Sequence, residues 1–200
     1  MNEIVADVLT WSRFSERHGY DFNSYLLRHP EGNLCIDPVE PSEAVLDQIA
    51  GIGATRILLT NRNHTRAANL LRSRLGARTA IHPKDADYAR SQGAEIDDAF
   101  DVGERIGPLQ VIGIPGKSPG EVGLFWQERK LLIVGDAVIG NPPGRCGLLP
   151  EKVMDDPVQL KQSLQAVLVL DFDTLLMGDG SSIVSHGKDR LNELVARLHD

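Results

Sequence analysis

Four short polar segments of the sequence hold most of the side chains that could do chemistry. Each follows an apolar run, where a strand would end, and functional groups gather on such loops at one edge of a scaffold. The segments are residues 60–66, 115–120, 135–136 and 178–180. Their carboxylates, amides, histidine and cations could hold a divalent ion or bind an anionic ligand. Ordinary strand exits, with Asn and Asp as caps and turn residues, are the alternative.

The histidines are the first candidates for metal ligands, and the sequence has six of them. His64 lies within the first polar segment. The other five have no partner at metal-ligand spacing, and they are His18, His29, His82, His186 and His199. We expect His82 to line the interior of the fold and His186 to cap a loop.

Composition limits the classes of partner. The 200 residues, 42% hydrophobic and 24% charged, predict one domain over residues 1–200. A formal net charge of −7 opposes attraction to phosphates, so we expect neither nucleic acid nor a membrane as partner. The first residues form no signal-peptide core. The two cysteines, Cys35 and Cys146, lack disulfide or zinc spacing, which favours the cytoplasm.

Apolar periodicity predicts strands and helices in alternation, with hairpins in each half. Turn residues at 30–33 separate two apolar runs and predict a β-hairpin. Helices are predicted from Ser42 to Gly53 and over residues 65–75, 158–170 and 188–198. Further strands are predicted over residues 56–60, 79–81, 109–114, 121–126, 130–134 and 174–177. The fold class is therefore α/β or α+β, with sheets covered by outer helices.

Aromatic residues concentrate near the start of the sequence. They are predicted to fill the core of the first sheet, and a homodimer interface is the alternative. The residues concerned are Trp11, Phe14, Tyr20, Phe22 and Tyr25.

Together, an early hairpin and the four polar segments resemble the metallo-β-lactamase-fold superfamily over nearly the whole chain. The hairpin reads Gly-Asn-Leu-Cys-Ile-Asp-Pro at residues 32–38, and a later loop reads Pro-Gly-Lys-Ser-Pro-Gly at residues 115–120. Two further strands end in Gly135-Asp136 and Gly178-Asp179-Gly180. The resemblance implies an αββα sandwich of two mixed β-sheets with outer helices. It also implies descent from hydrolases that hold two metal ions, commonly zinc.

The positions at which that family places metal ligands carry other residue types here. Asp136 alone matches a ligand. The replaced positions, in chain order, are Asn61, Asn63, Thr65, Arg66, Lys117 and Asp179. Asn is a weak ligand, and Arg or Lys brings positive charge to the place of a cation. The resemblance thus implies a divergent member without the dinuclear centre, and we expect no cofactor.

Loss of two ions would leave carboxylates facing one another in a partly desolvated cleft, which is unfavourable without a positive charge. We expect Arg66 to pair with Asp136, and Lys117 to pair with Asp179 or Asp136. If the pair is buried, Arg66→Ala would cost about 3–5 kcal/mol of stability.

The orientation of His64 decides between a site filled by ion pairs and a site that binds a metal ion. It comes one residue after a motif histidine position, and we predict that it faces outward from the first turn of a helix. The alternative is a small shift of the loop that turns it inward. His64, Asp136 and Asp179 would then form an N/O set for a single divalent ion.

Three functions follow from these observations. The first, which we predict, is a non-zinc, catalytically inactive relative that binds or senses a small molecule, although Lys117 near an Arg could act as base or nucleophile. The second is a divergent hydrolase of ester, thioester or phosphoester bonds with one metal at Asp136, Asp179 and His64. The third is a structural subunit. The pocket residues common to the first two are Asn61, Asn63, His64, Arg66, Lys117, Asp136 and Asp179.

Overall fold

Two units of the chain each form a sheet with its own helices. A computed structural model describes residues 1–198, and His199 lies outside the described residues. The first unit is Met1–Phe100 and the second begins at Asp101, and each is described by itself. A single domain over residues 1–200 stays a prediction.

The first unit, all of which is described, contains a seven-stranded mixed sheet in the order β1-β2-β3-β4-β5-β6-β7. Strands β1 to β4 pair antiparallel, and β4 to β7 pair parallel. The strands are β1 (Asn2–Val5), β2 (Val8–Ser15), β3 (Tyr20–Leu27), β4 (Leu34–Ile36), β5 (Arg56–Leu59), β6 (Arg78–Ile81) and β7 (Asp98–Ala99). The carboxyl ends of the parallel strands therefore meet at one edge of this sheet.

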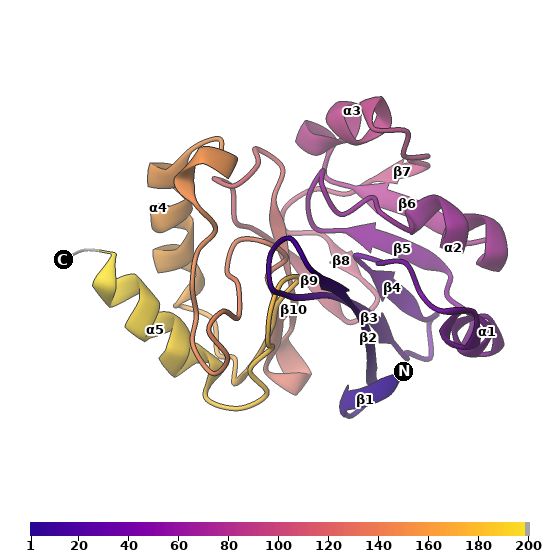
Figure 1. The fold of residues 1–200 in the computed structure, drawn as a ribbon, viewed down its shortest axis with the longest axis horizontal. Helices are drawn as coiled ribbons and strands as arrows, with labels where there is room; N and C mark the ends of the chain where they lie inside the picture. The colour runs from indigo at the N-terminus through magenta and orange to yellow at the C-terminus, as the bar shows by residue number, and fades with distance from the viewer. Residues whose placement is uncertain (199–200) are drawn as a thin grey trace. The chain divides into compact units, whose positions relative to one another are not determined.

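Three helices connect the parallel strands of the first unit (Figure 1). They are α1 (Glu43–Ile52), α2 (Ala68–Leu75) and α3 (Pro83–Ser91). The Ser42 side chain accepts from the Val45 amide at the start of α1, and His82 caps α3 by accepting from the Lys84 amide. Ile49 of α1 and Leu71 of α2 pack with Leu26 in one apolar core on the helix side of the sheet.

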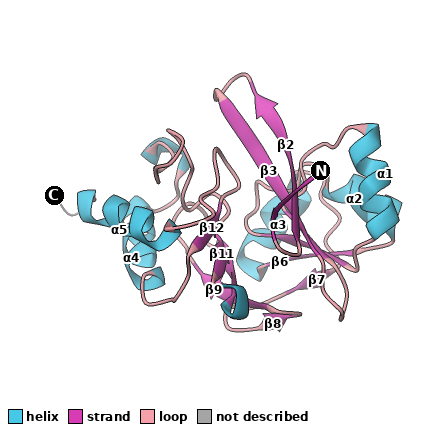
Figure 2. Ribbon diagram, turned by 90° about the horizontal axis from the view of Figure 1, so that it is seen from below, coloured by secondary structure: helices cyan, strands magenta, loops and turns pink. Residues whose placement is uncertain are grey.

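A two-stranded arm extends from the first sheet. Strand β4 pairs only with Tyr25–Leu27 of β3, whereas β2 and β3 continue to pair up to Ser15 and Tyr20. Residues 11–15 and 20–24 therefore form a hairpin beyond the β3–β4 ladder, which we call the arm (Figure 2).

The described part of the second unit, residues 101–198, contains a five-stranded mixed sheet in the order β12-β11-β10-β9-β8. Only β11 and β12 pair parallel there. The strands are β8 (Arg105–Ile106), β9 (Leu109–Gly113), β10 (Val122–Trp126), β11 (Leu131–Ile133) and β12 (Thr174–Leu176). Helices α4 (Pro157–Val167) and α5 (Gly187–Arg197) bury Leu164 and Leu194 in a core with Leu132 of β11.

The predicted fold class is confirmed: the chain has two mixed sheets with helices between and beside their strands. The predicted elements are present, but the helix expected from Thr65 begins at Ala68. Helix α3 was missed because its buried face consists mainly of Ala86 and Ala89, too small to produce an apolar period. Strands β1, β2, β7 and β8 were also missed.

The aromatic residues near the N-terminus divide between core and surface. Trp11 and Tyr25 are buried, as the core prediction requires, whereas Phe14 is 59% exposed. A homodimer therefore stays a prediction. None of the helices in the described part of the chain has the length and apolar character of a membrane span.

An ion pair ties α2 to the segment that precedes β7. Arg72 donates to both carboxylate oxygens of Asp97 at 2.8 and 2.7 Å, and the Thr79 amide donates to Asp97 at 2.9 Å. The Arg72 hydrogen bonds, followed by that from Thr79, hold the pKa of Asp97 far below its usual range.

We predict that Asp97→Asn lowers Tm at pH 7 by about 2–4 °C, because the ionised carboxylate stabilises the fold. Because the pKa of Asp97 is lower in the folded state than its unfolded value of about 4, the carboxylate stabilises the fold fully at pH values above about 4. This stabilisation is lost as the pH falls below about 4 towards the folded-state pKa. The difference between the two proteins should therefore narrow from pH 7 to pH 3 in thermal unfolding. Asp87→Asn, at a fully exposed carboxylate, is the control. A Tm difference independent of pH would contradict the assignment.

Candidate functional site

Strand register brings Asp136 and Asp179 together. Ile133 of β11 pairs with Leu176 of the parallel strand β12, and each aspartate comes three residues after its member of that pair. Their carboxylate oxygens lie within 4.8 Å of one another, and both side chains are buried. Two buried carboxylates at this distance repel one another unless a positive charge lies between them.

Glycines allow the two aspartate turns to touch. The Gly178 amide donates to the Gly135 carbonyl at 2.9 Å, and the Gly140 amide donates to the Asp179 carbonyl at 2.9 Å. A Cβ on Gly140 would lie 2.0 Å from the Ser181 carbonyl oxygen, so no side chain fits there. These backbone contacts fix both carboxylates at the same edge of the second sheet.

The loop at residues 115–120 is held against α4. Ser163 of α4 donates to the Pro115 carbonyl at 2.8 Å, and the Asp156 amide donates to the Gly116 carbonyl at 2.8 Å. Gly116 has φ +141°, and a Cβ there would lie 2.4 Å from the Leu160 backbone. The loop therefore has little freedom, and it sets the direction of Lys117.

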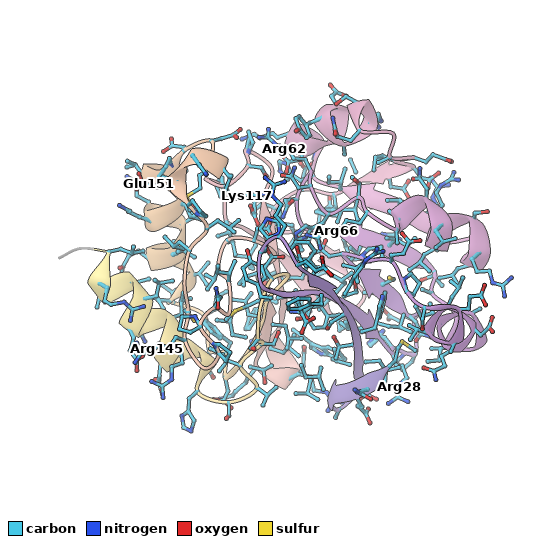
Figure 3. All side chains as sticks on the ribbon, viewed as in Figure 1. Arg28, Arg62, Arg66, Lys117, Arg145 and Glu151 are labelled. Carbon is cyan, nitrogen blue, oxygen red and sulfur yellow. The ribbon has the colours of Figure 1, made fainter. Side chains whose placement is uncertain are left out.

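Lys117 forms the ion pair predicted with Asp136. Its Nζ lies 2.9 Å from Asp136 Oδ2, and the two side chains are 6% and 7% exposed. Figure 3 labels Lys117 among the side chains. Glu121, also buried, accepts from the Asp136 amide at 2.9 Å. Since an Asp179 carboxylate oxygen lies within 4.8 Å of one of Asp136, the ammonium lies in a buried cluster that contains several carboxylates.

A second buried cluster forms in the first unit, where β4 and β5 end. Asp37, which directly follows β4, has φ +49°, and its carboxylate contacts Thr60, the residue after β5. It accepts from the Thr60 amide at 2.8 Å and from the Thr60 hydroxyl at 2.6 Å. His64 Nδ1 lies 2.9 Å from the same carboxylate. These contacts position the segment of residues 60–66.

The prediction that His64 faces outward is wrong. Its side chain is fully buried, with Nδ1 against Asp37 and the Thr60 hydroxyl at 3.1 Å. The physical reason is that residues 61–67 form turns rather than the first turn of a helix, and the Asp37 carboxylate turns the imidazole inward. The signal that this expectation overlooked is Asp37 itself, an acid that directly follows an apolar strand.

The two asparagines of this segment differ in their surroundings. Asn61 is buried and its Oδ1 accepts from the Asn63 amide at 2.8 Å, whereas Asn63 is exposed. Thr65 is partly exposed. On the other side of the turn, the buried Asp85 of α3 accepts from the Arg62 amide at 2.9 Å. Asn61 thus acts as a turn residue within this segment.

Arg66 is exposed, which contradicts the expectation that it forms a buried ion pair. Its guanidinium lies over the Phe22 ring of the arm, 4.2 Å from the ring centroid. The aromatic ring of Phe22 holds the guanidinium towards the surface of the first unit. The cost of 3–5 kcal/mol expected for Arg66→Ala therefore no longer applies, because that value belongs to buried pairs.

Sequence reasoning also passed over Glu121. It stands at the end of the Pro-Gly loop, before the five buried residues of β10, and is itself 1% exposed. An acidic residue beside a fully apolar strand is the signal that could have identified it, because a carboxylate is buried only with hydrogen-bond partners.

Two mixed sheets, with polar residues gathered where parallel strands end, define an α/β fold of the metallo-β-lactamase kind. The sequence profile of the Metallo-beta-lactamase superfamily matches residues 3–198. The chain therefore belongs to this superfamily, as its motifs indicated.

Solved structures agree with this membership. The crystal structure of TTHA1623 in a di-iron-bound form is 27% identical, with 82% of this chain and 90% of that one covered and a TM-score of 0.68. A metallo-beta-lactamase from Pontibacter korlensis is 16% identical, covers 100% and 98%, and has a TM-score of 0.80. The family protein TTHA1429 from Thermus thermophilus is 18% identical, covers 98% and 80%, and has a TM-score of 0.73. No curated protein matches the chain.

We predict that Lys117→Met lowers the free energy of unfolding by about 3–5 kcal/mol, because it leaves a buried carboxylate without its cation. The double variant Lys117→Met, Asp136→Asn should recover part of that loss. Denaturant unfolding followed by circular dichroism measures both.

Lys130→Met is the matched control. Lys130 pairs with Asp171 at 2.8 Å, but the two side chains are 58% and 76% exposed, so its replacement should leave stability nearly unchanged. If Lys117→Met and Lys130→Met lowered the free energy of unfolding equally, the larger effect predicted for the buried ion pair would be wrong.

Proposed function

We propose that this chain is a superfamily member that functions without the dinuclear metal centre and binds a small-molecule ligand. The observation that carries the proposal is the contact of 2.9 Å between Lys117 Nζ and Asp136 Oδ2. A divalent ion on that carboxylate oxygen would stand within a few ångströms of a buried ammonium, and the two positive charges would repel.

The chemistry of the other side chains supports the same proposal. Asn61 Oδ1 already accepts a hydrogen bond from the Asn63 amide, and Asn63 itself is exposed. Amide oxygens are weak ligands for zinc, which prefers imidazole and thiolate. The residues at these positions do not fit a pair of metal ions, so no reaction step is assigned to one.

A single-metal hydrolase is the second candidate, with the ion on Asp136, Asp179 and His64. The distance of at most 4.8 Å between a carboxylate oxygen of Asp136 and one of Asp179 favours it. The relative TTHA1623, for its part, has a di-iron-bound form. His64 presents Nδ1 to a carboxylate, an arrangement common for metal-binding imidazoles, so an ion would have to take Nε2. This candidate requires Lys117 to leave Asp136.

We further propose a cytoplasmic location for the chain and a small molecule as its partner. A cytoplasmic location is supported by Cys35 and Cys146, which are both free thiols and both buried. Burial raises the pKa of Cys146 to about 12, so its thiol stays protonated and unreactive. We expect no nucleic acid or membrane among the partners, and a measurement of mass in solution tests whether the chain forms a homodimer.

We predict less than about a tenth of an equivalent of zinc, iron or manganese in protein purified without chelator, because Lys117 supplies the charge that an ion would. Elemental analysis by mass spectrometry measures this. Lys117→His is the informative variant: it removes the ammonium and adds an imidazole, so its zinc content should rise.

Hydrolysis assays provide a second test of the metal-free function. Ester, thioester and phosphodiester substrates should show no turnover that added metal increases. A full equivalent of metal in the wild-type protein, together with metal-dependent hydrolysis, would overturn the proposed function and favour the second candidate.

A further inference from the structure

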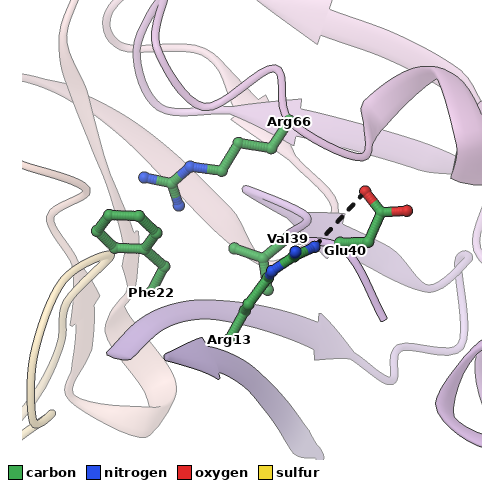
Figure 4. Close-up of a pocket in the computed structure, with 5 residues that line it drawn as sticks. All are labelled: Arg13, Phe22, Val39, Glu40 and Arg66. Carbon is green, nitrogen blue, oxygen red and sulfur yellow. Dashed lines mark ion pairs between the residues drawn. The ribbon is translucent and has the colours of Figure 1, made fainter. Parts of the chain in front are cut away.

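The first unit has a surface pocket of its own, and no residue of the Lys117 ion pair lines it. It is a cavity of about 280 Å³ lined by Arg13, Phe22, Val39, Glu40 and Arg66 (Figure 4). All five residues belong to the first unit. Two guanidiniums and one carboxylate face a cavity whose remaining side chains are apolar.

The position of this pocket follows from the arm. Side chains alternate along a strand, so Phe22, Ser24 and Leu26 of β3 face the same side of the sheet. Leu26 lies in the core beneath the helices, and Phe22 packs only at the edge of that core. Phe22 therefore lies where the helix-covered core ends, and it lines the cavity.

Cross-strand pairing adds the first arginine. Arg13 of β2 stands directly opposite Phe22 of β3, so the two side chains project from the same face of the arm. Arg66, from the turn that precedes α2, reaches the Phe22 ring from another direction, with its guanidinium 4.2 Å from the ring centroid. The ring thus has the Arg66 guanidinium against its surface, whereas the Arg13 guanidinium is directed towards Glu40 (Figure 4).

Hydrogen bonds hold the floor of the pocket in place. Val39 is 1% exposed, and its amide donates to the Ser24 hydroxyl at 2.6 Å. Its carbonyl accepts from the Trp11 indole at 3.0 Å. Both backbone groups are therefore fixed to the arm. An apolar floor that is already fixed lowers the ordering cost of binding.

Glu40 indicates which chemical group the two arginines bind. Its carboxylate lies 3.9 Å from the Arg13 guanidinium, a long contact, and the side chains are 61% and 60% exposed. An exposed pair of this kind contributes little to stability, so a ligand can displace it. A ligand carboxylate would therefore replace the Glu40 carboxylate at the Arg13 guanidinium.

We propose that this pocket binds a small carboxylate that carries an aromatic or other flat apolar group. The carboxylate pairs with Arg66 and Arg13, whose forks match its planar geometry, and the apolar group packs on Phe22 and Val39. The volume suits a ligand of about one ring, because it lies at the lower end of small-molecule sites. The proposal rests on the proposed function, since it names the class of ligand that the metal-free chain binds.

Benzoate is the probe, with benzyl alcohol and acetate for comparison. Amide chemical shifts of the ¹⁵N-labelled full chain, followed by NMR during titration, give the affinity and the place of binding. Benzoate should bind with a Kd of about 1 mM, as expected for so few atoms, and shift the amides of Phe22 and Val39. Benzyl alcohol, which lacks the charge, should bind at least about tenfold more weakly.

Variants of opposite expected effect test the assignment. Arg66→Gln should weaken benzoate binding about tenfold, because it removes a charged hydrogen-bond donor. Glu40→Gln should tighten it about threefold, because the competing carboxylate is gone. Phe22→Leu should weaken benzoate binding but leave acetate binding unchanged. Arg145→Gln, at an exposed arginine of the second unit, should change neither (Figure 3).

Several results would overturn the proposal. They are the absence of shifts at about 20 mM benzoate, equal affinity for benzyl alcohol, or an affinity that Arg66→Gln leaves unchanged. Metal content of the same sample separates this failure from that of the proposed function. Metal-free protein without benzoate binding refutes the pocket alone, whereas benzoate binding by protein with a full metal equivalent refutes the metal-free function alone.

Discussion

Electrostatic repulsion between the two buried aspartates is the constraint on which the second unit depends. Asp136 and Asp179 are brought together because β11 and β12 are parallel neighbours in register, and backbone hydrogen bonds join the turns that carry them. Their charge must be balanced within the protein, since buried charges require partners. Lys117 offsets the charge of Asp136, and the loop that carries it is held in place by α4.

The sequence predicted this cluster better than it predicted the surroundings of His64. Asp136, Asp179 and Lys117 follow strands or stand in a short Pro-Gly loop, where local pattern and motif fix the position of each side chain. His64 depends on Asp37, which is distant in sequence and adopts a left-handed conformation at the end of β4. A contact of this kind leaves no periodic trace in the sequence: Asp37 after an apolar strand indicates a buried acid, but its pairing with His64 is visible only in the tertiary structure.

Arg66 illustrates a second limit of sequence reasoning. Charge balance alone suggested a buried pair, but the guanidinium lies over Phe22, a residue of the arm that was expected to belong to the core. The register of β2 and β3 determines this contact, because it places Phe22 where the helix-covered core ends. The consequence is a local concentration of positive charge on a chain whose net charge is −7. An anion is thus attracted to this pocket despite the sign of the whole molecule.

The arm gives the pocket different dynamics from the ion pair. Beyond Tyr25, its backbone hydrogen bonds join β2 and β3 to one another without the support of β4. Two-stranded hairpins open at a lower free energy than strands inside a sheet, so amide protons of the arm exchange with solvent through local opening. Lys117 lies on a loop that α4 holds by a hydrogen bond, and Asp136 lies on a turn that is hydrogen-bonded to the turn of Asp179. Local opening of the arm therefore gives a ligand a way into and out of the pocket without breaking these contacts of the second unit.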